Sequence, residues 1–260
     1  MRWNACLGLL VLLAAGCTTV PYHYGKDVEY VHGYRLPEGE PQIATGRPNG
    51  FLDACDWIWP GSLLGKLMLW NVKVRINGYS VGEEWRRTFR NKAVGAGWRY
   101  TMGFISWLGY TIMPGRFFGG DNYNPYSNTI NIYSDLVPVG LHESGHAKDF
   151  AGRTWKGTYS VFYSVVPFFN LYPEGKASSD ALSYLQDKQD FAMKKSAYKL
   201  LYPAWGSYVG ADTGEWLETP WDYAVQLGAI VSGHIVGRTR AAFAPSAAPP
   251  PAKPSESASE

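Results

Sequence analysis

The sequence predicts an α+β fold in which a small sheet precedes a mostly helical C-terminal half. Three stretches carry this prediction. Residues 71–77 alternate between apolar and polar side chains, as a half-buried strand does, and residues 128–133 have the composition of a second short strand. Residues 135–152 follow directly and predict a long helix, so this strand and this helix are joined almost without a connection.

The N-terminus predicts export and a lipid anchor. Residues 1–16 combine a basic start with a short apolar core, which is typical of a secretory leader and too short for a membrane span. The small residues before Cys17 resemble a bacterial lipobox, and this implies cleavage after Gly16 and a lipid on Cys17. With Thr18 next, the resemblance implies an envelope protein anchored in the bilayer at the periplasmic face of the outer membrane. The alternative is an ordinary signal peptide that contains a cysteine.

The rest of the chain divides into a tether, one domain and a tail. Residues 17–50 are rich in Pro, Gly and Tyr without periodicity, which predicts a flexible tether. Residues 51–240 are long enough for one packed domain, and residues 241–260 have the Ala, Pro, Ser and Glu composition of a disordered tail. Cys55 has no partner left for a disulfide and is expected to be a buried thiol. The net charge of +2 gives no indication that the protein binds nucleic acid.

Further helices and loops are predicted around the two strands. The predicted helices are 62–70, 81–92, 174–188 and 221–238, and the predicted loops are 119–125 and 198–219. Arg86, Arg87 and Arg90 are expected on a solvated face of their helix. The runs 100–113, 158–172 and 223–237 carry no charge and are each about 15 residues long, which is short of a span. We expect them to pack in the core, and contact with the bilayer surface is the alternative.

The helix at 135–152 contains an H-E-x-x-H motif. Ser134 or Asp135 can cap its start, Pro138 is tolerated in the first turn, and Gly152 follows its end. Within this helix, His142 and His146 lie one turn apart on the same face, so both imidazoles can reach one metal ion. Glu143 is offset by one residue and can take a proton from a water molecule beside that ion.

These residues resemble the site of zincin metallopeptidases, which hold a catalytic zinc ion (Zn2+). The resemblance implies that Glu143 is the general base and that His142 and His146 are zinc ligands. As in gluzincins, a carboxylate from a later helix would be the third ligand, and Glu174 at the start of 174–188 suits this role. Gluzincins often place an Asp four residues after that Glu, where this chain has Ser178, so Asp180 remains an alternative ligand or a partner that orients a histidine.

The resemblance also gives the strand at 128–133 a role. In zincins an edge strand before the metal helix pairs with the extended backbone of the substrate, and an ordinary core strand is the alternative here. A hydrogen-bond donor must stabilise the oxyanion, and the sequence leaves several candidates open. These candidates are Tyr123, Tyr126, Tyr159, Tyr163, Tyr172 and His234, of which His234 is expected to be a core residue.

Two functions follow from these features. The first is a membrane-tethered, zinc-dependent peptidase of the cell envelope, with a peptide or protein substrate. The second is a non-catalytic envelope lipoprotein, an interaction or scaffold module that retains a metallopeptidase fold. Residues 119–150 also resemble a family of exported bacterial proteins with a very similar stretch around the motif, a resemblance that implies no substrate.

Overall fold

The fold is taken from a computed structural model, which describes residues 43–45, 72–76, 78–113, 120–134 and 136–246. The predicted leader, Cys17, Cys55, the helix at 62–70 and the end of the tail lie outside these residues. Part of the predicted tether is described, because Ile43–Thr45 forms a strand. The prediction of an irregular tether up to residue 50 is therefore wrong for these three residues.

A four-stranded sheet lies at the centre, in the order β1-β2-β4-β3. Its strands are β1 (Ile43–Thr45), β2 (Lys73–Ile76), β3 (Asn122–Asn124) and β4 (Thr129–Ile132). β1, β2 and β4 are parallel, and β3 runs antiparallel to β4 with Tyr123 opposite Ile130. The prediction that the strand at 128–133 is an edge strand is wrong, because β4 lies between β2 and β3. The edge is β3, inside a stretch predicted to be a loop.

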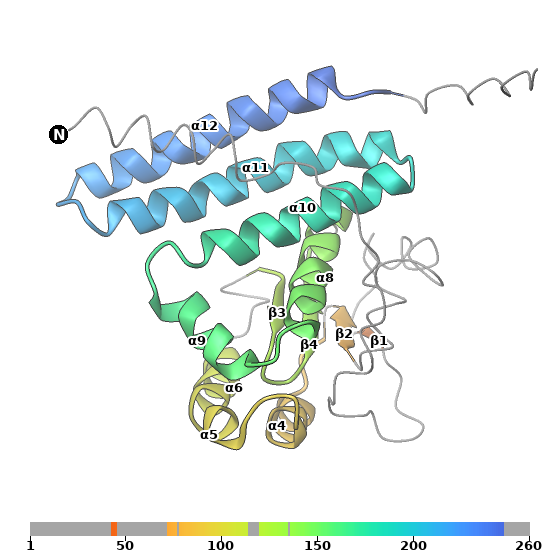
Figure 1. The fold of residues 1–260 in the computed structure, drawn as a ribbon, viewed down its shortest axis with the longest axis vertical. Helices are drawn as coiled ribbons and strands as arrows, with labels where there is room; N and C mark the ends of the chain where they lie inside the picture. Colours follow the sequence, from red (N-terminus) through yellow and green to blue (C-terminus); the bar gives the residue numbers. More distant parts are fainter. Residues whose placement is uncertain (1–42, 46–71, 77, 114–119, 135, 247–260) are drawn as a thin grey trace, which may run out of the picture.

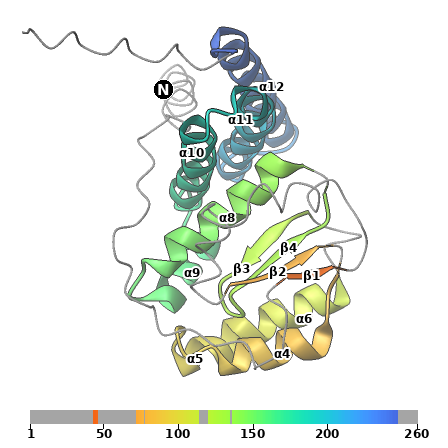
Figure 2. The same ribbon diagram turned by 90° about the vertical axis from the view of Figure 1, so that its right-hand side faces the viewer.

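Helices cover both faces of this sheet (Figure 2). One face carries α4 (Val81–Arg90), α5 (Ala96–Trp98), the π-helical turn η1 (Arg99–Gly103) and α6 (Phe104–Ile112). The other face carries α8 (Val137–Ala151), and α9 (Lys156–Val165) follows it along the chain. Beyond α8 lie α10 (Leu171–Asp187), α11 (Phe191–Gly214) and α12 (Trp221–Phe243), which is the outermost layer (Figure 1). The α+β class and the helical C-terminal half are confirmed.

Two different layers pack against β2. Val74 and Ile76 belong to the apolar core that β2 and β4 form with α8 and the later helices. The intervening Lys73 and Arg75 are also buried, and they pair with α4, where Nη2 of Arg75 lies 3.3 Å from a Glu83 oxygen and Nη1 contacts Glu84. β2 was predicted to be half-buried, but it is buried on both faces. Burial of its basic side chains is possible because carboxylates of α4 neutralise their charge.

The same helix fixes the hairpin that joins β3 to β4. The Asn124 amide donates to Glu84 over 2.9 Å, and the Arg87 guanidinium donates to the carbonyl oxygens of Ser127 (3.1 Å) and Asn128 (3.0 Å). Arg87 is fully buried, so its expected place on a solvated face is wrong. Asn128 has a φ of 54°, a left-handed conformation that Asn adopts more easily than most residues, and it closes the hairpin.

The prediction of a loop at 198–219 is wrong, because α11 extends to Gly214. Glycines of α11 and α12 lie where the two helices touch. A β-carbon on Gly210 would lie 2.6 Å from Cα of Gln226 in α12, and one on Gly233 of α12 would lie 2.6 Å from the Tyr202 carbonyl oxygen in α11. The backbones of α11 and α12 therefore touch along their length, which only residues without side chains permit.

This contact predicts opposite effects for two glycines of α12. Gly233→Ala should lower the free energy of unfolding by about 1–3 kcal/mol, because the new methyl group forces α12 away from α11. Gly228→Ala should raise it by about 0.5–1 kcal/mol, since nothing lies near its β-carbon and alanine favours a helix. Urea unfolding followed by circular dichroism measures both. Equal effects of the two variants would contradict the packing of α12 on α11.

The charge-free runs are largely on the surface. The expectation that they pack in the core is wrong for most of their large side chains, since α6 buries none of its residues, Phe162 and Val165 of α9 are exposed, and so are Leu227 and Ile235 of α12. Among the described residues, no helix has both the length and the apolar character that a membrane span requires.

Candidate metal centre and adjoining cleft

The helix that carries the motif is α8, and its ends differ partly from prediction. Pro138 lies in its first turn and the Gly152 N–H closes its end by donating to the Lys148 carbonyl, as expected. Its start has no side-chain cap, because the N-cap residue is Leu136. The expected cap Ser134 instead bonds to the Asp121 carboxylate, and Asp135 lies outside the described residues.

A buried lysine supports the C-terminal end of α8. The Lys156 ammonium donates to the carbonyl oxygens of Phe150, Ala151 (2.9 Å) and Arg153 (2.8 Å). A positive charge is favourable there, because the carbonyls at the end of a helix have no partner of their own and carry its negative pole. Burial nevertheless lowers the pKa of Lys156 to about 8.

The two histidines of the motif converge as predicted. Their Nε2 atoms lie 3.1 Å apart, and their ring planes are nearly perpendicular at 89°. Both rings are buried, so the two Nε2 atoms are largely shielded from bulk water. His142 and His146 thus aim the same ring atom at one point in space.

Glu174 brings a carboxylate to that point from α10. Its Oε2 lies 2.9 Å from His142 Nε2, and its Oε1 lies 3.3 Å from His146 Nε2. Its helix begins at Leu171 and not at residue 174, which places Glu174 in the first turn. Glu174, the predicted third ligand, therefore lies next to the two imidazoles although it is 28 residues after His146 in the sequence (174 − 146 = 28).

A close contact between α8 and α10 makes this convergence possible. A β-carbon on Gly145 would lie 2.8 Å from both Cα and the carbonyl oxygen of Ala177, closer than such atoms approach one another. Gly145 lies between the two histidines of the motif, and Ala177 lies one turn after Glu174. The absent side chain at 145 therefore sets the distance at which Glu174 meets the histidines.

Ser178 contacts one of the two motif histidines from α10. Its hydroxyl lies 3.1 Å from His142 Nδ1, on the ring edge opposite the point of convergence. The role considered for Asp180 is wrong, because Asp180 accepts a hydrogen bond from Lys148 Nζ at 2.9 Å, another link between α8 and α10. The residue of α10 that contacts the other ring nitrogen of His142 is therefore Ser178, four residues after Glu174.

Glu143 lies beside the histidines at the head of a cleft. It is buried and accepts a hydrogen bond from the Tyr123 backbone N–H of β3. Burial is the main cause that raises its pKa to about 8, with Glu174 adding to the shift and His142 opposing it. Ligand atoms of His142, Glu143 and His146 lie within 4.8 Å of one another, so this group could hold a metal ion.

Two tyrosines approach Glu174 from the cleft. The Tyr163 hydroxyl of α9 donates to Oε1, and the Tyr208 hydroxyl of α11 also bonds to this carboxylate. Burial opposes ionisation of Glu174, but the imidazoles of His146 and His142 outweigh it and hold the pKa of Glu174 below its ordinary value. Tyr163 is among the predicted oxyanion donors. Tyr208 is not among them.

The other candidate donors point elsewhere. The Tyr123 hydroxyl donates to Asn128 and the Tyr126 hydroxyl accepts from Ser160, both away from the histidines. The Tyr159 hydroxyl donates to Asp149, and the Tyr172 hydroxyl accepts from Arg153. His234 is on α12 and is exposed, so its expected place in the core is wrong.

The donor set of the centre suits a cation. When Nδ1 of His142 donates its proton to Ser178, its Nε2 presents a lone pair to the Glu174 carboxylate. Nε2 of His146 and the two Glu174 oxygens then also act as acceptors toward the same point. The distances between these atoms and the two Nε2 atoms are 2.9–3.3 Å. Buried acceptors that face one another repel, and a cation between them satisfies all three.

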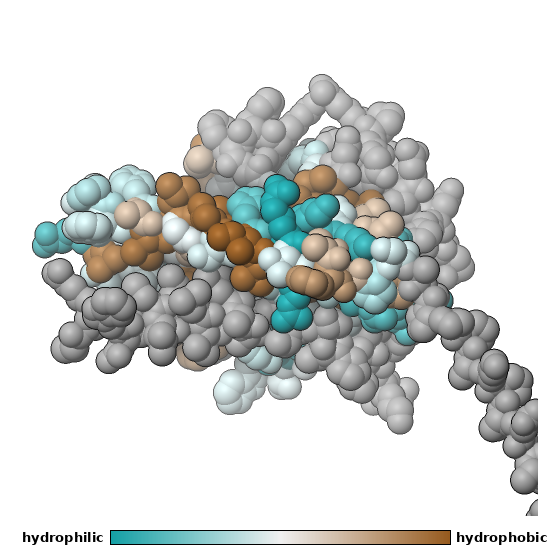
Figure 3. All heavy atoms as spheres, turned by 90° about the horizontal axis from the view of Figure 1, so that it is seen from above, coloured by the Kyte–Doolittle hydropathy of each residue, from teal (hydrophilic) through white to brown (hydrophobic). Residues whose placement is uncertain are grey.

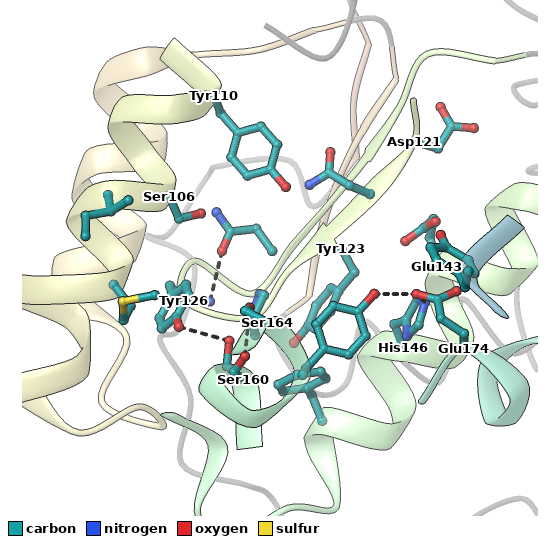
Figure 4. Close-up of a pocket in the computed structure, with 18 residues that line it drawn as sticks. Ser106, Tyr110, Asp121, Tyr123, Tyr126, Glu143, His146, Ser160, Ser164 and Glu174 are labelled. Atoms are coloured by element: carbon teal, nitrogen blue, oxygen red, sulfur yellow. Dashed lines mark hydrogen bonds and ion pairs between the residues drawn. The ribbon is translucent and has the colours of Figure 1, made fainter. Parts of the chain in front are cut away.

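The cleft runs from this centre to α6 (Figure 4). It has a volume of about 340 Å³, and its walls come from β3, α6 and α9. Glu143, His146 and Glu174 lie at one end, and Ser106 and Tyr110 of α6 lie at the other (Figure 4). All three residues of β3 line the cleft, so the edge of the sheet at which no described strand pairs with β3 borders this space.

One buried carboxylate joins the three helices of the centre. Asp149 of α8 accepts hydrogen bonds from Tyr159 of α9 (2.6 Å), from Arg153 (2.7 Å) and from Lys176 of α10. The Arg153 guanidinium also lies over the Tyr159 ring, 4.3 Å from its centre. These bonds fix α9 and α10 against α8 one turn beyond His146.

Comparisons of the chain with protein-family models, with curated proteins and with solved structures gave no match.

The contact of Ser178 with His142 predicts a loss of metal affinity. Ser178→Ala should weaken the binding of Zn2+ about tenfold, because partners that orient a ligand histidine typically contribute 10- to 100-fold. Ser232→Ala is the matched control, since the Ser232 hydroxyl bonds only within α12, to the Gly228 carbonyl. Competition titration with a chromogenic chelator measures both. Unchanged affinity in Ser178→Ala would show that the hydroxyl does not orient His142.

Proposed function

We propose that the protein is a zinc-dependent peptidase with a zincin-like arrangement, tethered to the cell envelope through a lipid on Cys17. One observation carries the proposal. The Glu174 carboxylate lies 2.9 and 3.3 Å from the Nε2 atoms of the two motif histidines, with Glu143 beside them at the head of a cleft. Three protein ligands and an adjacent carboxylate are the groups that a hydrolytic zinc site requires.

The distances within the centre support zinc. Bonds from Zn2+ to nitrogen or oxygen are about 2.0–2.2 Å, so neighbouring ligands of a tetrahedral ion lie about 3.3–3.5 Å apart. The ligand atoms here are separated by 2.9, 3.1 and 3.3 Å, which small side-chain movements bring to that range. When bound, such an ion lowers the pKa of a water molecule to about 7 and polarises a carbonyl group.

The residues of the chain supply the proton transfers and the binding. In this proposal Glu143 accepts the proton of the attacking water and passes it to the leaving amine, because its carboxylate lies beside the two histidines at the head of the cleft. Tyr163 and Tyr208 are placed to donate a hydrogen bond to the oxyanion from the Glu174 side of the cleft. The unpaired edge of β3 can bind the substrate backbone in extended form.

The non-catalytic alternative implies a closed pocket, filled by the Tyr- and Phe-rich segment at 158–172. Tyr163 and Ser164 of that segment line the cleft beside Glu143 but leave a volume of about 340 Å³. This open space favours the catalytic function over a scaffold. The envelope location rests on the sequence of residues 1–17 alone, and the substrate remains a peptide or protein of undefined sequence.

The role of Glu143 gives the direct test. Glu143→Gln should retain the metal and lower the rate of hydrolysis about 10²- to 10⁴-fold, because the amide cannot accept a proton. Fluorescently labelled casein serves as an unfolded protein substrate, and elemental analysis counts zinc per chain. Glu215→Gln, which changes an exposed carboxylate, is the control. Full activity in Glu143→Gln would reject the proposed role.

Glu174→Gln separates metal binding from chemistry. This variant should bind zinc more weakly and lose activity in proportion, because an amide oxygen is a poorer ligand than a carboxylate for this ion. The expected readouts are less than one zinc per chain after dialysis and partial recovery of activity at high zinc concentration. Zinc retention equal to that of the unmodified protein would place the third ligand elsewhere.

A further inference from the structure

The outward face of α12 carries an apolar stripe. Tyr223, Leu227, Val231 and Ile235 follow one another at intervals of one helical turn, and they are 66%, 62%, 47% and 62% exposed. The sequence from 223 to 237 contains no Asp, Glu, Lys or Arg. Figure 3, which views this side of the molecule, shows hydrophobic residues as a band along it. The opposite face of α12 is the one that contacts α11 through glycines.

The two ends of the stripe differ in chemistry. Trp216 and Trp221 are exposed at the N-terminal end of α12, beside Tyr223. Arg238 and Arg240 follow the stripe at its other end, and neither forms an ion pair with any residue that the structure describes. Trp and Tyr are favoured at the level of lipid headgroups, and unpaired arginines attract anionic ones.

A hollow adjoins the basic end of the stripe. It has a volume of about 510 Å³ and is lined by Ile235, Val236 and Phe243 as well as by Lys194 and Arg240. Apolar side chains and cations in one hollow match the two parts of an anionic phospholipid, the acyl chain and the phosphate. The hollow continues the stripe, because Ile235 belongs to both.

We propose that the outward face of α12 lies on the surface of a bilayer that contains anionic phospholipid. A helix with one apolar face, aromatic residues and basic residues binds in the plane of such a surface through its buried apolar area and its charges. A second copy of the chain suits the stripe less well. Two helices that pack along each other need apolar residues at alternating spacings of three and four. Continued from Leu227 and Val231, this pattern falls on His234 and Arg238, which are not apolar.

This contact orients the molecule. No residue of α12 lines the cleft, whose walls come from β3, α6 and α9. In Figure 1 these three elements and α12 lie on opposite sides of α10 and α11. With α12 on the bilayer, the cleft points away from the lipid. The inference does not depend on the proposed peptidase activity, because it uses neither the histidines nor the cleft.

A photo-crosslinking experiment on the full, acylated chain tests the orientation. A benzophenone amino acid replaces Val231 in one protein and Leu108 in another, since Leu108 is an exposed apolar residue of α6 on the other side of the molecule. Both proteins carry the same anchor, so any difference reports which face meets the lipid. The probes are vesicles of phosphatidylethanolamine with phosphatidylglycerol and vesicles of phosphatidylcholine alone, and intact-mass spectrometry detects the adducts.

The expected result is a phospholipid adduct at position 231, at least fivefold above that at 108, in the vesicles that contain phosphatidylglycerol. The adduct should fall about tenfold in the Arg238→Glu/Arg240→Glu variant and also decrease in phosphatidylcholine alone. Equal capture at both positions, no lipid adduct at 231, or capture of a second chain at 231 would each overturn the proposal. An adduct unaffected by the charge reversal would overturn the role of the basic end. Circular dichroism confirms that each variant is folded.

Discussion

The structure depends on the convergence of acceptors in a buried place. Two imidazole nitrogens and a carboxylate converge within 3.3 Å, and burial leaves these polar groups dependent on one another or on a bound cation for a partner. The surrounding fold holds them in this arrangement. Asp149 joins α8 to α9 and α10, and Lys148 pairs with Asp180 across the same two helices. The ion pairs that flank the centre therefore hold together the helices that carry the two histidines and Glu174.

The edge strand is held by a second buried ionic group on the opposite face of the sheet. Glu84 of α4 binds Arg75 of the central strand β2 and also Asn124 at the end of β3. β3 has only three residues and pairs on one side alone, so its own hydrogen bonds do not fix it firmly. The carboxylate on the far side of the sheet thus determines where the border of the cleft lies, and the Tyr123 N–H of that border contacts Glu143.

The sequence was sufficient for the features that local rules determine. The helix around the motif, the shared face of His142 and His146, and Gly152 at the helix end follow from helical periodicity and backbone preference. Glu174 could be named because the resemblance to gluzincins implies a ligand carboxylate on a later helix, and Glu174 begins the next predicted one. Features that depend on distant parts of the chain were missed. The stretch at 198–219 was predicted to be a loop, but most of it belongs to α11, whose glycines touch the backbone of α12, and Tyr208 of this helix was missed. The order of the sheet, which makes β3 and not β4 the edge, depends on pairing partners that no single strand reveals.

The contact of Gly145 with the backbone of Ala177 also determines how relatives of this chain can be recognised. Any side chain at position 145 would push the carboxylate-bearing helix outward and open the ligand set. A homologue that shares the site by descent should therefore show H-E-x-G-H, followed 28 residues later by Glu and three residues after that by Ala or Gly (174 − 146 = 28; 177 − 174 = 3). Such a spaced signature is more selective than the five-residue motif, because it encodes the distance between two helices as well as the chemistry on one of them.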